Sequence, residues 1–168
     1  MTKKATFQLE FENHVKEGLT AFPKYLSSKY IYDERGDELF QQIMALPEYY
    51  LTQAEYNIMN QHKSELRELF SAQGAFDLIE LGAGDGKKTK LLLKHLSEIQ
   101  ANFTYLPVDI SQNVLDELGN ALEHEFPSLN VELLQGSYFN VLNQLSSYNK
   151  RQKVILVLGS NIGNLMHE

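Results

Sequence analysis

Residues 76 to 86 read Phe-Asp-Leu-Ile-Glu-Leu-Gly-Ala-Gly-Asp-Gly, a mostly apolar stretch that leads directly into a glycine-rich loop. The stretch Phe76–Leu81 predicts a short strand, and the leucines after the loop predict a helix over residues 87–99. Gly82 and Gly84 let the backbone approach a ligand closely, and the start of the helix adds unpaired N–H groups. Together, the strand, the loop and the helix predict a ligand-binding site.

The rest of the second half repeats this alternation of strand and helix. Further strands are expected over residues 103–108, 131–134 and 154–158. A helix between the first two of these is predicted by apolar residues at helical spacing, namely Val114, Leu115, Leu118, Ala121 and Leu122. Strands that alternate with helices predict an α/β fold with a parallel sheet and helices on both faces. Ligands bind such sheets at the carboxyl ends of the strands, which here are residues 80–86, 109–111, 135–138 and 159–164.

The spacing of the loop favours one class of cofactor over another. Dinucleotide sites use G-x-G-x-x-G, whereas this loop reads G-x-G-x-G and contains Asp85, which would repel a pyrophosphate. A sulfonium compound such as S-adenosylmethionine tolerates nearby carboxylates. Asp109, at the end of the second strand, can accept hydrogen bonds from both ribose hydroxyls of either cofactor, or can simply be a charge at a helix start beside Ser111. A nicotinamide-dependent oxidoreductase therefore stays open as an alternative.

The first half of the chain is expected to be helical. The stretch 37–46 places apolar side chains on one stripe and is ended by Pro47. Thr52 and Glu55 have the form of a capping box, so a second helix should begin there, and Gly74 should follow its end. The apolar side expected for this helix comprises Ala54, Ile58, Leu66, Leu69 and Phe70. We thus predict a helical segment over residues 1–70 and a partial ligand-binding domain over residues 71–168.

Composition narrows the class of protein. The net charge of −7 argues against nucleic-acid binding, and no stretch reaches the roughly 18 apolar residues of a membrane span. The chain has no cysteine, and its five histidines show no metal-ligand spacing, so no metal site is expected. Four lysines, Lys87, Lys88, Lys90 and Lys94, are best explained as a solvated helix face. A soluble, cytoplasmic protein is expected.

Five motifs of the chain resemble the histidine-specific methyltransferase family. They are Y-I-Y-D-E-R-G (30–36), E-L-F (38–40), L-P-E-Y-Y-L-T (46–52), E-L-G-A-G-D-G-K-K-T (80–89) and L-G-S-N-I-G-N-L (158–165). The first and third motifs are far more specific than the glycine loop. Known members methylate the α-amine of histidine with S-adenosylmethionine, giving the trimethylated product hercynine in ergothioneine biosynthesis. The resemblance implies a Rossmann-like class I methyltransferase domain preceded by a helical segment that helps to form the substrate pocket.

The resemblance also implies roles for residues at matching positions. The cofactor would be held by Glu80, Gly82, Ala83, Gly84, Gly86, Lys88, Asp109, Ser137 and Tyr138. The substrate pocket would include Tyr32, Phe40, Tyr49, Gly159 and Asn164, with Tyr32 and Tyr49 nearest the reacting amine and Asn164 on the substrate carboxylate. Without the family, Tyr32 and Tyr49 would be taken as packing residues, and the turn at Ser137–Tyr138 is almost as well explained as surface.

Two departures from the family pattern limit these expectations. Family members often have Asp-Phe where this chain has Ser137-Tyr138. The family also continues past the position of Glu168 with further strands and a substrate-binding insertion, so we expect an N-terminal portion that has an incomplete sheet and little activity alone. An unpaired sheet edge would favour homodimer formation. A non-catalytic ligand-binding fragment is the second alternative.

Overall fold

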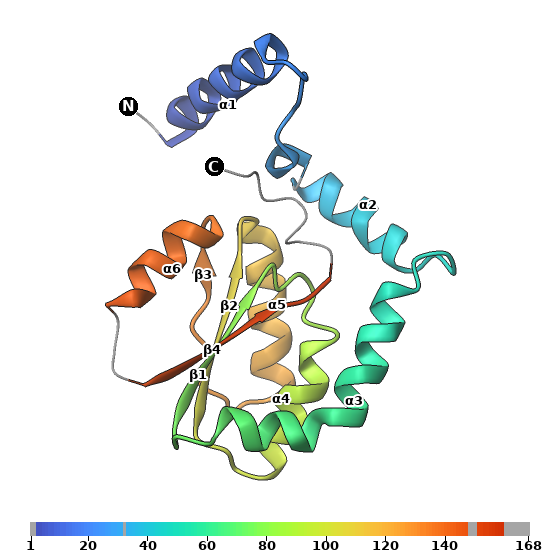
Figure 1. The fold of residues 1–168 in the computed structure, drawn as a ribbon, viewed down its shortest axis with the longest axis vertical. Helices are drawn as coiled ribbons and strands as arrows, with labels where there is room; N and C mark the ends of the chain where they lie inside the picture. Colours follow the sequence, from blue (N-terminus) through green and yellow to red (C-terminus); the bar gives the residue numbers. More distant parts are fainter. Residues whose placement is uncertain (1–2, 32, 148–150, 160–168) are drawn as a thin grey trace.

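The computed structural model describes residues 3–31, 33–147 and 151–159. Among the described residues, three α-helices and a short 3-10 helix come first and are followed by a four-stranded sheet with its helices (Figure 1). The elements are α1 (Lys3–Thr20), the short 3-10 helix η1 (Ser28–Ile31), α2 (Glu34–Met44), α3 (Leu51–Phe70), β1 (Phe76–Leu81), α4 (Thr89–Glu98), β2 (Phe103–Asp109), α5 (Gln112–Glu125), β3 (Leu134–Gln135), α6 (Tyr138–Ser146) and β4 (Gln152–Val157).

The sheet is parallel throughout and has the strand order β3-β2-β1-β4. β1 lies in the centre, where Phe76 pairs with Phe103 of β2 on one side and with Gln152 of β4 on the other. All six residues of β1 are buried, because both of its edges are paired and helices cover both of its faces. The predicted α/β architecture with a parallel sheet is confirmed.

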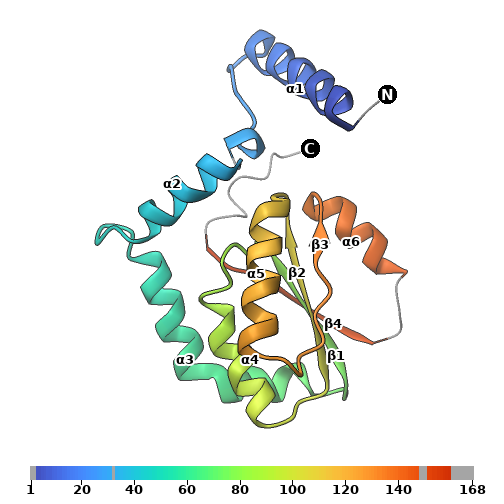
Figure 2. The same ribbon diagram turned by 180° about the vertical axis from the view of Figure 1, so that it is seen from behind.

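Two apolar cores lie on opposite faces of the sheet. On one face, α3, α4 and α5 pack over side chains of β1 and β2, among them Phe76 and Tyr105. On the other face, α6 places Val141 and Leu145 over Ile79 and Leu106. Figure 2 shows α4 and α5 together on one side of the strands and α6 apart from them. Helices on both faces are therefore confirmed.

The first two helices lie away from the sheet, at the upper end of the molecule in Figure 1. Tyr30 of η1 packs edge-on against Phe11 of α1, with 4.8 Å between ring centroids. The hydroxyl oxygen of Tyr30 lies 2.5 Å from His14 Nδ1. α3 then runs back to the sheet, where its residues Met59 and Phe70 are buried in the larger core.

Several predicted boundaries were wrong by a few residues. α2 starts at Glu34, because the Asp33 side chain accepts a hydrogen bond from Gly36 N at 2.8 Å and caps the helix earlier than expected. β3 starts at Leu134, and Val131 forms only an isolated bridge with Tyr105.

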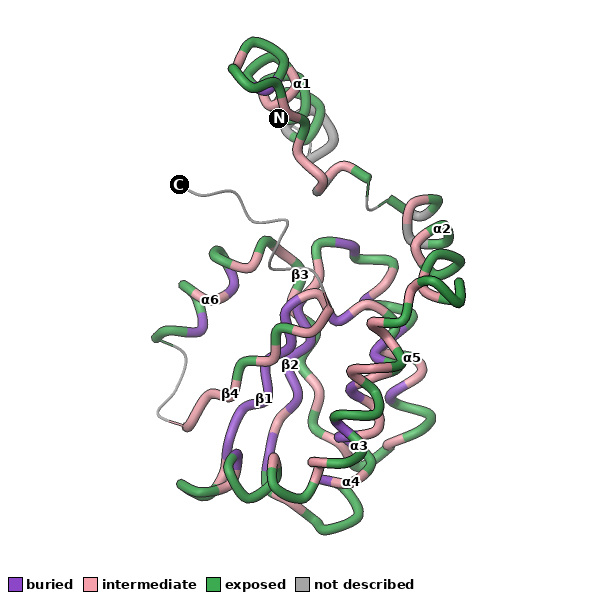
Figure 3. Tube along the Cα trace, turned by 45° about the vertical axis from the view of Figure 1, so that its right-hand side comes forward, coloured by how far each residue is buried: buried purple, intermediate pink, exposed green. Residues whose placement is uncertain are grey.

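The capping box predicted at Thr52 and Glu55 was wrong. The N-cap of α3 is Tyr50, which makes no capping hydrogen bond through its side chain, and the carboxylate of Glu55 is engaged elsewhere. The expected apolar side of this helix was also partly wrong, because Ile58 and Leu69 are exposed whereas Met59 is buried. Figure 3 shows the corresponding contrast between exposed helical segments and buried central strands. Among the described residues, no helix combines the length and apolar character needed to cross a bilayer.

Candidate functional site at the carboxyl edge of the sheet

The glycine loop after β1 is held against the end of β2 by backbone hydrogen bonds. Gly82 N and Ala83 N both donate to Val108 O, at 2.8 and 3.2 Å. Gly82, Gly84 and Gly86 have φ angles of +73°, +56° and +65°, which side-chain-bearing residues rarely adopt. The loop therefore presents bare backbone at the edge where parallel sheets bind ligands.

Asp109 joins this loop to the start of α5. Its Oδ2 accepts from Gly84 N at 3.2 Å, and its Oδ1 accepts from Ser111 N at 3.0 Å. Burial raises the pKa of the Asp109 carboxyl, and the hydrogen bonds from backbone N–H groups act in the opposite direction. The main-chain oxygen of Asp109 also accepts from Gly136 N at 3.0 Å. The loops after three neighbouring strands thus meet at one residue.

Glu80 lies beneath the loop, inside the larger core. Its side chain is 2% exposed, and its two oxygens accept hydrogen bonds from the hydroxyls of Thr89, at 2.6 Å, and Tyr105. Burial raises the pKa of Glu80 to about 7, and the two hydroxyl hydrogen bonds lower it in part. These contacts tie the end of β1 to β2 and α4, so Glu80 supports the loop from within. Direct contact between Glu80 and a cofactor stays a prediction.

The glycine loop leaves open space at Gly84 but not at Gly86. A Cβ added at Gly84 would meet no atom within 4 Å, whereas one at Gly86 would lie 2.6 Å from Leu118 Cδ1. Gly84 therefore borders open space and Gly86 borders the core. The exposed Asp85 accepts from Lys87 N at 3.0 Å and places negative charge at the loop, which fits a sulfonium ligand better than a phosphate.

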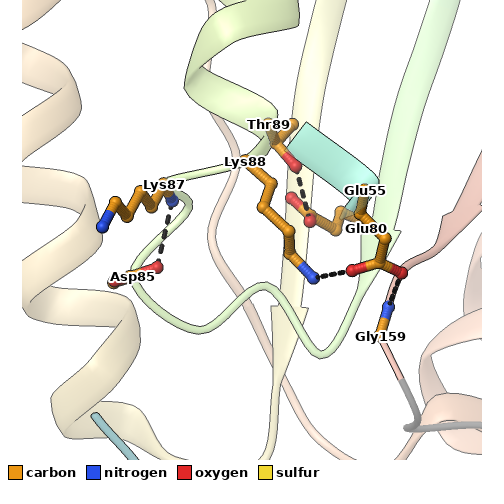
Figure 4. Close-up of polar contacts among 7 residues, drawn as sticks. All are labelled: Glu55, Glu80, Asp85, Lys87, Lys88, Thr89 and Gly159. Atoms are coloured by element: carbon orange, nitrogen blue, oxygen red, sulfur yellow. Dashed lines mark hydrogen bonds and ion pairs between the residues drawn. The ribbon is translucent and has the colours of Figure 1, made fainter. Parts of the chain in front are cut away.

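A three-way contact that sequence reasoning missed links the helical segment to this edge. Glu55 of α3 accepts from Lys88 Nζ through Oε2 at 2.6 Å and from Gly159 N through Oε1 at 2.5 Å (Figure 4). Lys88 directly precedes α4, and Gly159 follows β4. The only local signal at Glu55 was the Thr52–Glu55 spacing, which pointed to a different role.

The structure brings together two of the residues predicted for the substrate pocket. The rings of Phe40 and Tyr49 lie edge to face, with centroids 6.3 Å apart, and both side chains are half-buried. Gly159 is linked to Lys88, at the end of the glycine loop, because Glu55 contacts both residues. Tyr32 and Asn164 lie outside the described residues.

The two residues predicted to line the adenine begin α6. Ser137 is the N-cap of this helix, although its side chain makes no capping hydrogen bond, and Tyr138 is half-buried against the smaller core. Gly136, which precedes them, is bound to Asp109 as described above. Ser137 and Tyr138 are therefore at the same edge as the glycine loop, and their contact with a cofactor stays a prediction. No cluster of three potential metal ligands occurs in the part of the chain that the structure describes.

The fold and this edge define the chain as a Rossmann-like domain of the methyltransferase type. Its fold is similar to that of the plantazolicin methyltransferase BpumL in complex with SAH, with a TM-score of 0.51 at 12% identity over 90% of this chain and 50% of that one. The model of the SAM-dependent, histidine-specific methyltransferase family matches residues 11–168, and the chain belongs to this family. Family membership also rules against the nicotinamide-dependent oxidoreductase considered from the sequence.

Two relatives illustrate the range of the family. The chain is 36% identical over 151 residues to a histidine N-alpha-methyltransferase of Mycolicibacterium smegmatis, covering 90% of this chain and 46% of that protein. It is 35% identical over 144 residues to ergothioneine biosynthesis protein 1 of Neurospora crassa, covering 84% of this chain and 16% of that protein. The chain thus spans less than half the length of these relatives.

Proposed function

We propose that the protein carrying this chain transfers methyl groups from S-adenosylmethionine to the α-amine of an amino acid, with histidine as the acceptor and trimethylhistidine as the product. The observation that carries the proposal is the joining of Gly84 to Asp109 at the carboxyl edge of the sheet, in a chain of the histidine-specific family. The names of the bacterial relative and of the family support histidine as the acceptor.

The described residues divide into a donor side and an acceptor side. On the donor side, the backbone at Gly82–Gly86 lies along the cofactor, and the Asp109 carboxylate accepts hydrogen bonds from the ribose hydroxyls. The Lys88 ammonium, one residue before α4, binds the carboxylate of the donor. Ser137 and Tyr138 lie beside the adenine ring.

The acceptor side is formed by the aromatic pair Phe40 and Tyr49 together with Gly159. When bound, S-adenosylmethionine would supply a methyl group on a sulfonium. The lone pair of the neutral amine attacks the methyl carbon, and the C–S bonding electrons leave with sulfur as adenosylhomocysteine. The amine loses a proton after the first and second transfers, and the third leaves a quaternary trimethylammonium group. Phe40 and Tyr49 present ring faces to the nitrogen as it becomes cationic, worth about 1 kcal/mol per contact. Alignment of donor and acceptor supplies most of the acceleration, and no nucleophilic side chain is required.

Calorimetry on this chain and an assay on the complete protein test the proposal. We expect adenosylhomocysteine to bind and raise the melting temperature, and NAD to do neither. In the complete protein, histidine should accept labelled methyl groups from S-adenosylmethionine up to the trimethylated product. Stabilisation by NAD alone, or methylation of other amines without histidine, would contradict the proposal.

A further inference from the structure

Glu55 makes its two contacts to residues that are remote from it along the chain. Lys88 is 33 residues away and Gly159 is 104 residues away. Figure 4 shows the Glu55 carboxylate between the lysine ammonium and the main-chain nitrogen of Gly159. One carboxylate of the helical segment therefore contacts both the end of the glycine loop and the loop after β4.

The burial of the pair makes it more than a surface ion pair. The side chains of Lys88 and Glu55 are only 19% and 25% exposed. In addition, the second carboxylate oxygen accepts from a main-chain N–H, which would lose its described partner without Glu55. A lysine side chain carries large rotamer entropy, so a fixed partner keeps its ammonium in one place before a ligand arrives.

A second lysine–glutamate pair provides an internal comparison. Lys90 Nζ lies 2.6 Å from Glu125 Oε1, the same distance as in the Lys88–Glu55 pair, and joins α4 to α5. Its side chains are 21% and 44% exposed, and Glu125 has no contact with the glycine loop or with Gly159 among the described hydrogen bonds. The Lys90–Glu125 pair therefore joins two helices, and none of its described side-chain hydrogen bonds reaches the glycine loop or Gly159.

We propose that Glu55 is a positioning residue of the methyl-transfer site, which orients the Lys88 ammonium toward the carboxylate of the methyl donor and fixes the amide of Gly159 on the acceptor side. The donor part of this inference rests on the proposed function. An ammonium has three N–H donors, and the contact with Glu55 uses one of them. Lys88 can therefore bind Glu55 and the donor carboxylate at the same time.

Two ligands that differ only at the amino acid end separate positioning from general stability. Adenosylhomocysteine carries the carboxylate that Lys88 would bind, and 5′-methylthioadenosine lacks it. For Glu55→Ala we expect about tenfold weaker binding of adenosylhomocysteine, with methylthioadenosine changed by less than about twofold. Glu55→Gln keeps one acceptor oxygen in place of two and should fall between Glu55→Ala and the parent chain. Glu125→Gln should change neither dissociation constant.

Amide hydrogen exchange tests the Gly159 contact independently of any ligand. Exchange at Gly159 should be faster in Glu55→Ala than in the parent chain or in Glu125→Gln. Equal weakening for both ligands, no weakening, or tighter binding of adenosylhomocysteine would overturn the donor part, and unchanged exchange at Gly159 would overturn the acceptor part. If the parent chain fails to bind adenosylhomocysteine at all, the proposed function fails, and the donor part with it, whereas the exchange result still judges the contact at Gly159.

Discussion

The strand β1 with its glycine loop and the helices α1 and α2 differ in how much of their surface the chain covers. Every residue of β1 is buried, and the loop that follows is bound to β2 through Val108 and Asp109. In the helices, large apolar side chains remain exposed, including Phe7 at 60% and Leu39 at 49%. The proposed donor side of the site is therefore fixed by packing within this chain, whereas α1 and α2, which include the proposed acceptor residue Phe40, leave large apolar side chains uncovered.

The largest expected effect is on the free energy of unfolding, and it compares a buried phenylalanine of the sheet with an exposed one of the helical segment. Phe76 is fully buried and stacks on Phe103 with centroids 5.6 Å apart, so Phe76→Ala should lower the free energy of unfolding by about 3–5 kcal/mol. Phe22 is fully exposed in the helical segment, and Phe22→Ala should change the same quantity by less than about 0.5 kcal/mol. Urea unfolding followed by circular dichroism measures both. Similar losses at the two positions would remove the contrast.

The next effect concerns the charge buried beneath the loop. The pKa of Glu80 is about 7 in the folded chain, against an ordinary value of 4.5, so the folded state holds this proton where the unfolded state has lost it. The free energy of unfolding should therefore fall as pH rises between these two values, by at most about 3 kcal/mol. Glu80→Gln has no group to ionise there and should lose this part of the pH dependence.

Unfolding free energies at about pH 5 and about pH 8, compared between variants, measure this contribution. Glu38→Gln changes an exposed glutamate of α2 and should keep the pH dependence of the parent chain. A Glu80→Gln variant with the same pH dependence as the parent chain would show that Glu80 ionises at its ordinary pH despite its burial.

A smaller effect on stability is expected at two glycines, one in the glycine loop and one in a turn far from it. Gly84 and Gly74 both have positive φ angles, +56° and +94°, and neither has an atom within 4 Å of an added Cβ. Gly84→Ala and Gly74→Ala should each cost about 1–2 kcal/mol through backbone strain. Only Gly84→Ala should weaken adenosylhomocysteine binding by about tenfold or more in calorimetry, because its methyl group occupies the space of the ligand. Equal affinity in both variants would place the cofactor away from Gly84.

The smallest effect tests the helical segment itself. Phe40→Leu removes the edge contact with Tyr49 and should lower the free energy of unfolding by about 0.5–1 kcal/mol. The matched change Phe11→Leu removes the similar contact with Tyr30. In the complete protein, only Phe40→Leu should raise the KM for histidine severalfold. A rise in both variants, or in neither, would argue against a substrate pocket at Phe40 and Tyr49.

The same contrast explains what the sequence could predict. The strands and the carboxyl edge of the sheet followed from local patterns, because apolar residues dominate buried strands such as Phe76–Leu81 and the loop requires its glycines. The helical segment was less predictable, because Ile58 fits an apolar stripe and is nevertheless 60% exposed. The partners of Glu55 were beyond local pattern altogether, because one of them lies 104 residues away.

The meeting of three loops at Asp109 has a consequence for chimaeric proteins. Gly84 and Gly136 both bind Asp109, so the turns after β1, β2 and β3 form one mechanical unit that cannot be exchanged piecemeal without leaving unmatched N–H groups. The helical segment reaches Lys88, beside this unit, through the carboxylate of Glu55, and α3 also packs Met59 and Phe70 into the larger core. Grafting a foreign helical segment therefore requires an acid at position 55 together with an apolar side of α3 that fits the larger core, whereas grafting a foreign glycine loop means replacing all three turns together.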